Sequence, residues 1–439
     1  MLRAGAVLLG TLAVAACHFH GGNAPDDSAP PRDAGGDAAV DAFVPLIDAP
    51  ALCSTWHATG FDPCSLGSPG AALELTAAGS PYTYDTTDAG GVLTDKMNQQ
   101  VATSQLTLAQ SGGPTLAVLS VDGFQLDTGA TLNVIGTKPL LIASWDALLV
   151  SGTLDAGSHT TETDPTKHVQ QTTQLGAGAG SASECTTGDG VPGLAAVHTG
   201  GAGGGGGGAL VGGGGSGGSG DTSCADAQGN GKTPCPRTGG AGGLGLGVPE
   251  VIRGGCAGAA TGAAGDGVSA PATATTVALG GGGGGGVQLS ARTTLTIGGE
   301  LIAGGAGGAG APQGSAVGGG GGGAGGYLAL DAPMVTVTGI VAANGGGGGG
   351  SAPFGGFGAV GTDGAASNTA APGGARNSGT CGEPGGNGAA NTSLDGANGG
   401  SFDSCGGGGG GGGAGLVIVY SNMFVSTGST ISPPVTTPF

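Results

Sequence analysis

Positively charged residues are scarce in this sequence. Ten lysines and arginines stand against 29 aspartates and glutamates in 439 residues, which gives a formal net charge of −19. Nucleic acids and anionic lipid headgroups are bound mainly through clusters of lysine and arginine. The chain has no such cluster, so we expect no nucleic acid partner and no polybasic contact with lipid. The acidic balance favours solubility instead.

Aromatic and charged side chains are also rare, at 3% and 9% of residues, whereas glycine occupies 109 positions. The glycines follow no strict three-residue period, which excludes a collagen triple helix. Disordered chains usually carry many charges and few branched apolar residues. Here 38% of the residues are hydrophobic, and the valines, leucines and isoleucines form short runs. Composition therefore favours an ordered β-protein with glycine-rich excursions.

The N-terminus has the sequence pattern of an export signal. After Arg3, an apolar stretch runs from Ala4 to Ala16, which is shorter than the roughly 20 residues of a membrane-spanning helix. The stretch ends in Val-Ala-Ala-Cys at Cys17 and resembles a bacterial lipobox. The resemblance implies that residues 1–17 are a lipoprotein signal peptide and that the thiol of Cys17 receives lipid. An ordinary signal peptide with a chance cysteine is the alternative.

The segment that follows has no usable apolar period. Residues 18–50 contain six aspartates among alanine, proline and glycine, which predicts an extended, self-repelling tether. We expect residues 51–104 to form an N-terminal cap, residues 105–433 the body of the fold and residues 434–439 a tail. With a lipid anchor at its start, the chain is expected at the outer membrane or the cell surface.

The cysteines fit an exported protein. Apart from Cys17 there are eight of them, and an even number in an exported chain predicts disulfides. Proximity in the sequence pairs Cys53 with Cys64 and Cys381 with Cys405, and leaves the other pairings open. No CxxC or CxxH spacing occurs, so no metal is expected. The remaining four cysteines lie in the first glycine-rich insertion: Cys185, Cys224, Cys235 and Cys256.

A short apolar stretch that ends in alanine and passes into a glycine tract occurs three times, at 148–156, 295–303 and 335–343. Each is preceded by another strand-like run, so the repeating unit reads as strand, turn, strand, glycine turn and short strand. Alternation turns Leu328 and its equivalents inward, and stacked units bury these columns together. We predict an all-β fold, a right-handed parallel β-helix. A β-sandwich is the alternative, but it does not require the insertions to leave at one recurring point.

The glycine-rich insertions span about 157–286, 304–325 and 344–415. If the repeating units stack, the insertions emerge side by side from one edge. Runs of glycine lack Cβ atoms and can pack closely as extended left-handed helices that exchange backbone hydrogen bonds. We therefore expect a polyglycine layer of the polyproline II type. Floppy loops are the alternative.

Several of these motifs occur together in one known group. The lipobox, the tether, the run LALDAP…VTVTGIVAANGG from Leu328 to Gly346 and the closing GGAGLVIV resemble a family of glycine-rich predicted surface lipoproteins common in myxobacteria. The resemblance covers about 105–433 and implies a non-catalytic surface protein. In composition the glycine layer is also similar to the polyglycine bundles at phage tail-fibre tips, where loops between the glycine helices bind receptors.

Catalytic residues are sparse. Polysaccharide lyases and hydrolases use clustered carboxylates, usually with arginine or lysine nearby, whereas the repeating units offer Asp155, Glu300 and Asp331 one apiece, with Arg292 as the nearest cation. Asp331 is expected to make a turn. We expect no catalytic residue, no metal and no cofactor. The histidines are expected to be exposed in loops; they include His57, His159, His168 and His198.

The sequence thus favours a lipid-anchored, cell-surface structural or adhesive protein. A module that binds a glycan or another ligand is the alternative, with Trp145 as a possible ligand contact, although packing of this ring in the core is favoured. A degenerate polysaccharide-active enzyme is a second alternative. Ice binding is a further option because Thr294 and Thr296, and Thr336 and Thr338, form TxT pairs. Expected partners are the membrane, through the anchor, and a surface glycan or protein receptor.

Overall fold

The computed structural model describes residues 53–437 except for short gaps at 89, 102, 104, 163–170, 181–184, 196–200, 221–222, 226–231, 235–236, 263–276, 314–316, 353–355, 377–381 and 402–405. The expected signal peptide and tether, Cys17 included, lie outside the described residues. Those residues belong to one unit, Asp48–Phe439. Within them, no helix has the length and apolarity needed to cross a bilayer.

The regular secondary structure of the described chain is almost entirely β-strand, as predicted. Its 3₁₀ helices are η1 (Pro63–Leu66) and η2 (Ala77–Gly79). Sheet A has the strand order β4 (Gln105–Leu108), β5 (Leu116–Val121), β8 (Leu140–Ser144), β15 (Gly286–Ala291), β18 (Tyr327–Asp331), β21 (Leu416–Tyr420). Sheet B has the order β1 (Leu73–Leu75), β6 (Phe124–Leu126), β9 (Leu148–Val150), β16 (Thr294–Ile297), β19 (Met334–Val337), β22 (Met423–Ser426).

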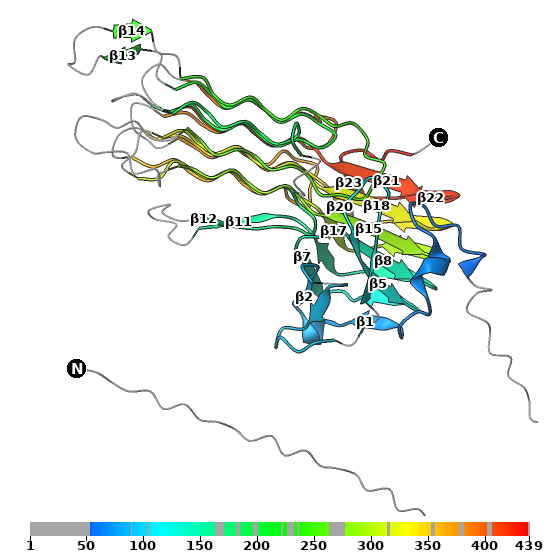
Figure 1. The fold of residues 1–439 in the computed structure, drawn as a ribbon. Helices are drawn as coiled ribbons and strands as arrows, with labels where there is room; N and C mark the ends of the chain where they lie inside the picture. The colour runs from blue at the N-terminus through cyan, green and yellow to red at the C-terminus, as the bar shows by residue number, and fades with distance from the viewer. Residues whose placement is uncertain are drawn as a thin grey trace, which may run out of the picture. The chain divides into compact units, whose positions relative to one another are not determined.

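Sheet C has the order β3 (Val92–Thr94), β2 (Tyr82–Asp85), β7 (Thr131–Ile135), β10 (Thr153–Asp155), β17 (Glu300–Ile302), β20 (Ile340–Ala342), β23 (Thr430–Ser432). Two hairpins stand apart, β11 (His159–Glu162) with β12 (Gln171–Gln174), and β13 (Ser223–Ala225) with β14 (Lys232–Pro234). From β5 onward, each round of the chain adds one strand to sheet A, then one to sheet B and one to sheet C (Figure 1).

Neighbouring strands of the three sheets pair in parallel, except for β3 and β4 at one edge. Because successive rounds pair in register, equivalent side chains form columns, and one column consists of Leu119, Ile142, Leu289, Leu330 and Val419. These residues are buried. Burial of one such side chain is worth about 1.5–3 kcal/mol, so stacking supplies a core that no single round could form.

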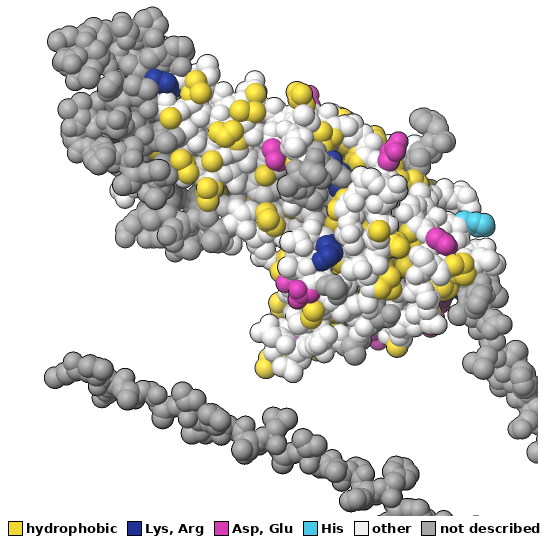
Figure 2. All heavy atoms as spheres, in the orientation of Figure 1, with side chains coloured by type: hydrophobic (Ala, Val, Ile, Leu, Met, Phe, Trp, Pro, Cys, Tyr) yellow, Lys and Arg dark blue, Asp and Glu magenta, His cyan; other side chains and the backbone are white. Residues whose placement is uncertain are grey.

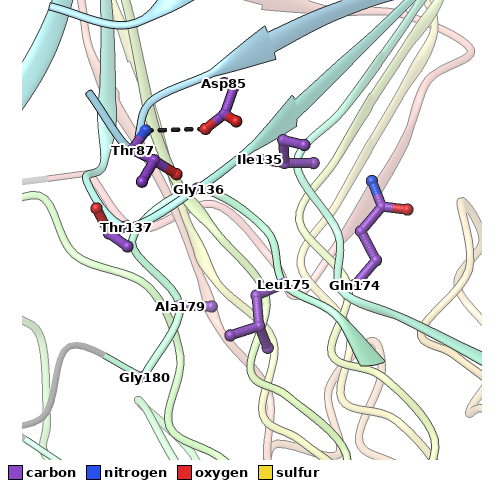
Figure 3. A pocket seen from close by; sticks show the side chains of 9 residues that line it. All are labelled: Asp85, Thr87, Ile135, Gly136, Thr137, Gln174, Leu175, Ala179 and Gly180. Carbon is purple, nitrogen blue, oxygen red and sulfur yellow. Dashed lines mark hydrogen bonds between the residues drawn. The ribbon is translucent and has the colours of Figure 1, made fainter. Parts of the chain in front are cut away.

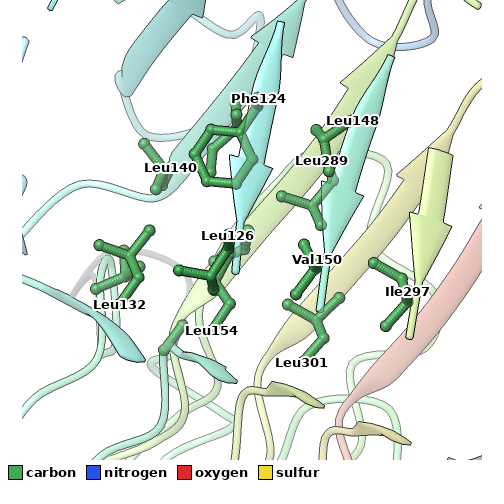
Figure 4. Packing of buried hydrophobic residues seen from close by; sticks show 14 of the residues in the cluster. Phe124, Leu126, Leu132, Leu140, Leu148, Val150, Leu154, Leu289, Ile297 and Leu301 are labelled. Carbon is green, nitrogen blue, oxygen red and sulfur yellow. The ribbon is translucent and has the colours of Figure 1, made fainter. Parts of the chain in front are cut away.

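The core lies between the three sheets. Figure 4 shows leucines from different sheets, such as Leu126, Leu132 and Leu140, pointing toward one another. The inward positions expected from the period of two, Leu328 and its equivalents, are buried in this core. Sheet A is covered on its other face as well, by Trp56 and other residues of the N-terminal segment. Its strands therefore lack the alternation of a half-exposed sheet.

The glycine-rich insertions leave and return at corresponding places. They follow β10, β17 and β20, which are neighbours in sheet C, and they lead into β15, β18 and β21, which are neighbours in sheet A. In Figure 1 they run side by side away from the sheets. The expectation that the insertions share one point of exit is thus confirmed.

The N-terminal segment differs from the expected boundary at residue 105. Parallel pairing begins earlier, because β1 pairs with β6 and β2 with β7. By contrast β4, which begins at Gln105, pairs antiparallel with β5 at the edge of sheet A. A strand of three residues carries too little alternation to be recognised from sequence, which is why the first round was not predicted.

Candidate functional sites

The glycine tracts form a hydrogen-bonded array that we call the glycine bundle: the described parts of residues 187–262, 277–285, 303–326 and 343–415. Tract 317–326 lies inside it. Every third amide of this tract donates to tract 406–415, through the N–O pairs Gly319–Gly407 (2.9 Å), Gly322–Gly410 (2.8 Å) and Gly325–Gly413 (3.0 Å). A repeat of three residues per turn is that of a polyproline II helix.

The intervening amides of tract 317–326 donate to two other neighbours, 303–312 and 253–262. Its carbonyls accept from three more, 201–209, 277–285 and 343–352. The tract therefore bonds to six neighbours. Tract 406–415 also bonds to six: 201–209, 212–220, 317–326, 343–352, 382–390 and 394–401. The expected exchange of backbone hydrogen bonds between tracts is confirmed, and it runs in every direction across the bundle.

Close approach of the tracts requires glycine. A methyl group on Gly320 would collide with the carbonyl oxygen of Leu279, and one on Gly409 would collide with the carbonyl oxygen of Gly320. Alanines are accepted at other positions of the same tracts. Ala306 and Ala324 are fully buried and still donate to Gly282 and Cys256 at 2.8 and 3.0 Å.

One outer part of the bundle exposes apolar side chains. Tracts 187–195 and 237–247 are neighbours, since the Val191 amide donates to the Ala241 carbonyl. On them Val191, Leu194 and Leu244 are 50%, 48% and 68% exposed. Figure 2 shows hydrophobic side chains scattered over the bundle among backbone and uncharged side chains, with few charges.

Two disulfides are present among the described residues. Cys53 pairs with Cys64, as predicted, and Cys185 pairs with Cys256 across a separation of 71 residues. The predicted pair of Cys381 and Cys405 lies outside the described residues, as does Cys235. Cys224 lies on β13; its side chain is outside the described part of the chain.

The Cys185–Cys256 disulfide lies in a polar cluster. The Nη2 of Arg253 donates to both sulfur atoms, at 3.2 and 3.4 Å. Burial raises the pKa of Asp189, whose Oδ1 accepts from the Ala257 amide at 2.9 Å. The donor atoms of Asp189 and the two cysteines lie within 4.8 Å of one another. Both sulfurs are oxidised, however, so the cluster offers no thiolate ligands to a metal.

His159 joins sheet C to the bundle. Its Nε2 is 3.1 Å from Asp155 Oδ2 and its Nδ1 is 3.2 Å from Asp363 Oδ2. The hydrogen bonds to Asp155 and then to Asp363 raise the pKa of His159 to about 10. At neutral pH both ring nitrogens therefore carry protons and neither can bind a metal. The expectation of a merely exposed loop histidine is wrong for His159, because it overlooked two partners from other parts of the chain.

The remaining histidines and charged residues singled out from the sequence do not form a cluster among the described residues. His57 is exposed, and His168 and His198 lie outside the described residues. Asp155 and Glu300 belong to adjacent strands of sheet C, whereas Asp331 belongs to sheet A. The Nε of Arg292 donates to the carbonyl of Trp145 at 2.6 Å.

Asp331 was expected to form a turn, and this is wrong. It is the last residue of β18 and is only 3% exposed. Its Oδ2 accepts from the Thr59 amide at 2.9 Å and from Ser290 Oγ at 3.0 Å. Burial raises the pKa of Asp331 to about 6. The carboxyl group borders a cavity of about 350 Å³ between the N-terminal segment and the ends of β18 and β21.

Trp145 is not available as a ligand contact. It is 3% exposed, it packs edge to face on Trp56 with ring centroids 5.4 Å apart, and its Nε1 donates to Ser120 Oγ at 3.1 Å. The favoured expectation that this ring packs in the core is therefore confirmed, and the alternative of an exposed binding ring is wrong. The N-terminal segment covers the outer face of sheet A at this point, and nothing near Trp145 in the sequence signals that cover.

A second cavity, of about 470 Å³, lies between β2, β7 and the segment after β12. Figure 3 shows Ile135, Leu175 and Ala179 on its walls. The nearby carboxylate of Asp85 accepts from the Thr87 amide at 2.9 Å within its own turn. The lining is therefore mainly apolar, and its one carboxylate is already engaged.

The threonine pairs do not form a regular array. Thr296 pairs with Thr336, but the same column of sheet B continues with Leu149 on one side and Val425 on the other. An ice-binding face needs a longer flat row of threonines than this.

Comparisons with protein families, curated proteins and solved structures find no match to the chain. A function is therefore inferred from the glycine bundle and the Asp331 cavity.

Proposed function

We propose that the chain is a lipid-anchored surface protein in which a right-handed parallel β-helix presents a bundle of polyglycine II helices for structural or adhesive contact. Parallel, in-register pairing in three sheets supports the β-helix. Parallel strands joined by crossovers are right-handed in about 98% of cases, which supports the hand. The anchor at Cys17 rests on the lipobox.

The observation that carries the proposal is the bonding of interior glycine tracts to six neighbours. Ordering one residue costs about 1–2 kcal/mol, and glycine is at the costly end of this range. A loose loop would avoid that cost. Bonds in all directions instead hold the bundle as a stiff projection, about 30 Å long for ten residues at about 3.1 Å each.

The outer surface of the bundle supports a role in contact. It combines exposed Val191, Leu194 and Leu244 with extended backbone and few charges. A projection with so few charges approaches another surface with less of the repulsion that the net charge of −19 would otherwise cause. The target is a surface or matrix outside the cell, or a receptor on a partner cell.

Attachment of cells that produce the full-length chain tests this proposal. Producing cells should attach to one another or to a matrix more strongly than non-producing cells. The triple variant Val191→Ser, Leu194→Ser, Leu244→Ser should lose most of this gain. Met423→Ser with Val425→Ser is the matched control, because these side chains are 57% and 40% exposed on β22. Equal attachment by the triple variant and the wild type would rule out contact through this face.

A further inference from the structure

We infer that the cavity beside Asp331 binds a sugar unit of a glycan. It lies on the β-sheet part of the chain and is distinct from the glycine bundle, so this inference does not rest on adhesion by the bundle. The cavity is lined by three parts of the chain that are far apart in sequence: the N-terminal segment, including His57 and Thr59; the end of β18 at Asp331; and the end of β21, with Tyr420 and Asn422.

The two oxygens of Asp331 differ in their surroundings. Oδ2 accepts from the Thr59 amide and Ser290 Oγ, and lies 3.5 Å from the Nε2 of Gln288. Oδ1 receives no hydrogen bond from the residues that the structure describes. Oδ1 is not fully buried, so it stays accessible from the cavity. A ligand in the cavity could donate a hydrogen bond to Oδ1, so that both oxygens of the Asp331 carboxylate would accept hydrogen bonds.

The lining favours a hydroxyl-bearing ligand. The carboxylate of Asp331 only accepts, whereas the threonine hydroxyls and the Asn422 amide can both donate and accept. Sugar hydroxyls have this same double capacity. An ammonium group only donates and would leave the donors of the lining unused. A phosphate would face the Asp331 carboxylate and the net charge of −19.

The size of the cavity agrees with a small sugar. Its volume of about 350 Å³ is at the lower end of the range of about 300–1,000 Å³ for small-molecule sites. Tyr420 is half-buried at the wall and adds an aromatic side chain, which can contact the apolar face of a sugar ring. Asn422 and His57 are exposed at the mouth.

The test is retention of the full-length protein on an array of neutral and acidic glycans, followed by affinity measurement with a retained oligosaccharide. The wild type should bind at least one neutral glycan. Asp331→Asn keeps the side-chain volume and should weaken binding about tenfold or more, because it removes a charged acceptor. Asn422→Ala, at an exposed position, should also weaken binding without changing the melting temperature.

Glu74→Gln is the control, because Glu74 is an exposed carboxylate on β1 and its loss should leave affinity unchanged. If Asp331→Asn fails to fold, the glycan affinity of Asn422→Ala alone decides whether the cavity is the binding site. The inference is overturned if no glycan is retained, if both cavity variants bind like the wild type, or if inorganic phosphate or an amine-bearing peptide competes for the site. The Val191, Leu194 and Leu244 triple variant should bind glycan normally, which separates this site from the bundle.

Discussion

At the scale of single residues, His159 shows how two distant carboxylates can set the charge of one side chain. Asp155 precedes it by four positions, whereas Asp363 lies 204 positions away in the third insertion. The ion pairs therefore tie that insertion to sheet C. The imidazole is 40% exposed, so solvent screening limits what each pair contributes to stability.

This cluster should make stability depend on pH. The folded pKa of His159 is raised from 6.5 to about 10. The resulting stabilisation is complete below about pH 6.5, where both folded and unfolded states are protonated, and it is lost as the pH rises through 10. Between pH 7 and 10 the melting temperature of the wild type should fall by about 1–3 °C more than that of His159→Gln. Parallel melting curves would show that the ion pairs contribute nothing.

A single methyl group should test the packing of the bundle. Gly320→Ala would place its Cβ against the Leu279 carbonyl, and such overpacking typically costs about 1–3 kcal/mol. Gly123→Ala is the matched control, since its nearest neighbours would be 3.8 Å away or more. Denaturant unfolding should show a loss for Gly320→Ala only. An equal effect of both substitutions would mean that the bundle tolerates side chains at this position.

At the scale of elements, the strands that follow glycine tracts were the easiest to predict. Runs such as Tyr327–Asp331 and Met334–Val337 alternate and recur with one spacing. The cover on the outer face of sheet A was not predictable, because Trp56 and Leu210 reach it from distant parts of the chain. Glycine runs likewise reveal that tracts can pack. They do not reveal which tracts become neighbours, because tracts of identical residues contain no side chains that would distinguish one pairing from another.

The two disulfides should differ in their effects on stability. In the chain-entropy account, the stabilisation by a disulfide grows with the loop that it closes and is typically about 2–4 kcal/mol. Cys185–Cys256 spans 71 residues, against 11 for Cys53–Cys64. Replacing Cys185 and Cys256 by serine should therefore lower the unfolding free energy by about 1.6 kcal/mol more than the same change at Cys53 and Cys64. Urea titrations of both double variants check the order, and a reversed order would contradict it.

At the scale of the whole molecule, the sequence predicted the all-β architecture, whereas the candidate sites emerge only from the structure. The Asp331 cavity could not be predicted, because its walls come from residues near 57, 331 and 420. Only the closing of successive rounds brings those positions together. Sequence periodicity indicates which residues of one strand share a face. It does not indicate which distant segments of the chain come into contact.

The proposed anchor gives a prediction at this scale. Cys17→Ala should move the chain from the membrane fraction to the soluble exported fraction, because no other lipid acceptor is expected. Mass spectrometry of the mature wild type should find a lipid-modified cysteine as the first residue. An unmodified N-terminus at another residue would indicate an ordinary signal peptide.

The backbone hydrogen bonds of tract 317–326 repeat every three residues. This repeat also limits which insertions and deletions the bundle can accept. Adding or removing three residues in a tract advances it by one full turn, so every donor again faces the same neighbouring tract. A change of one or two residues rotates the tract by a third or two thirds of a turn and aims each amide at the wrong neighbour. Length changes inside the bundle should therefore be tolerated in triplets, whereas the sheets tolerate changes only at their corners.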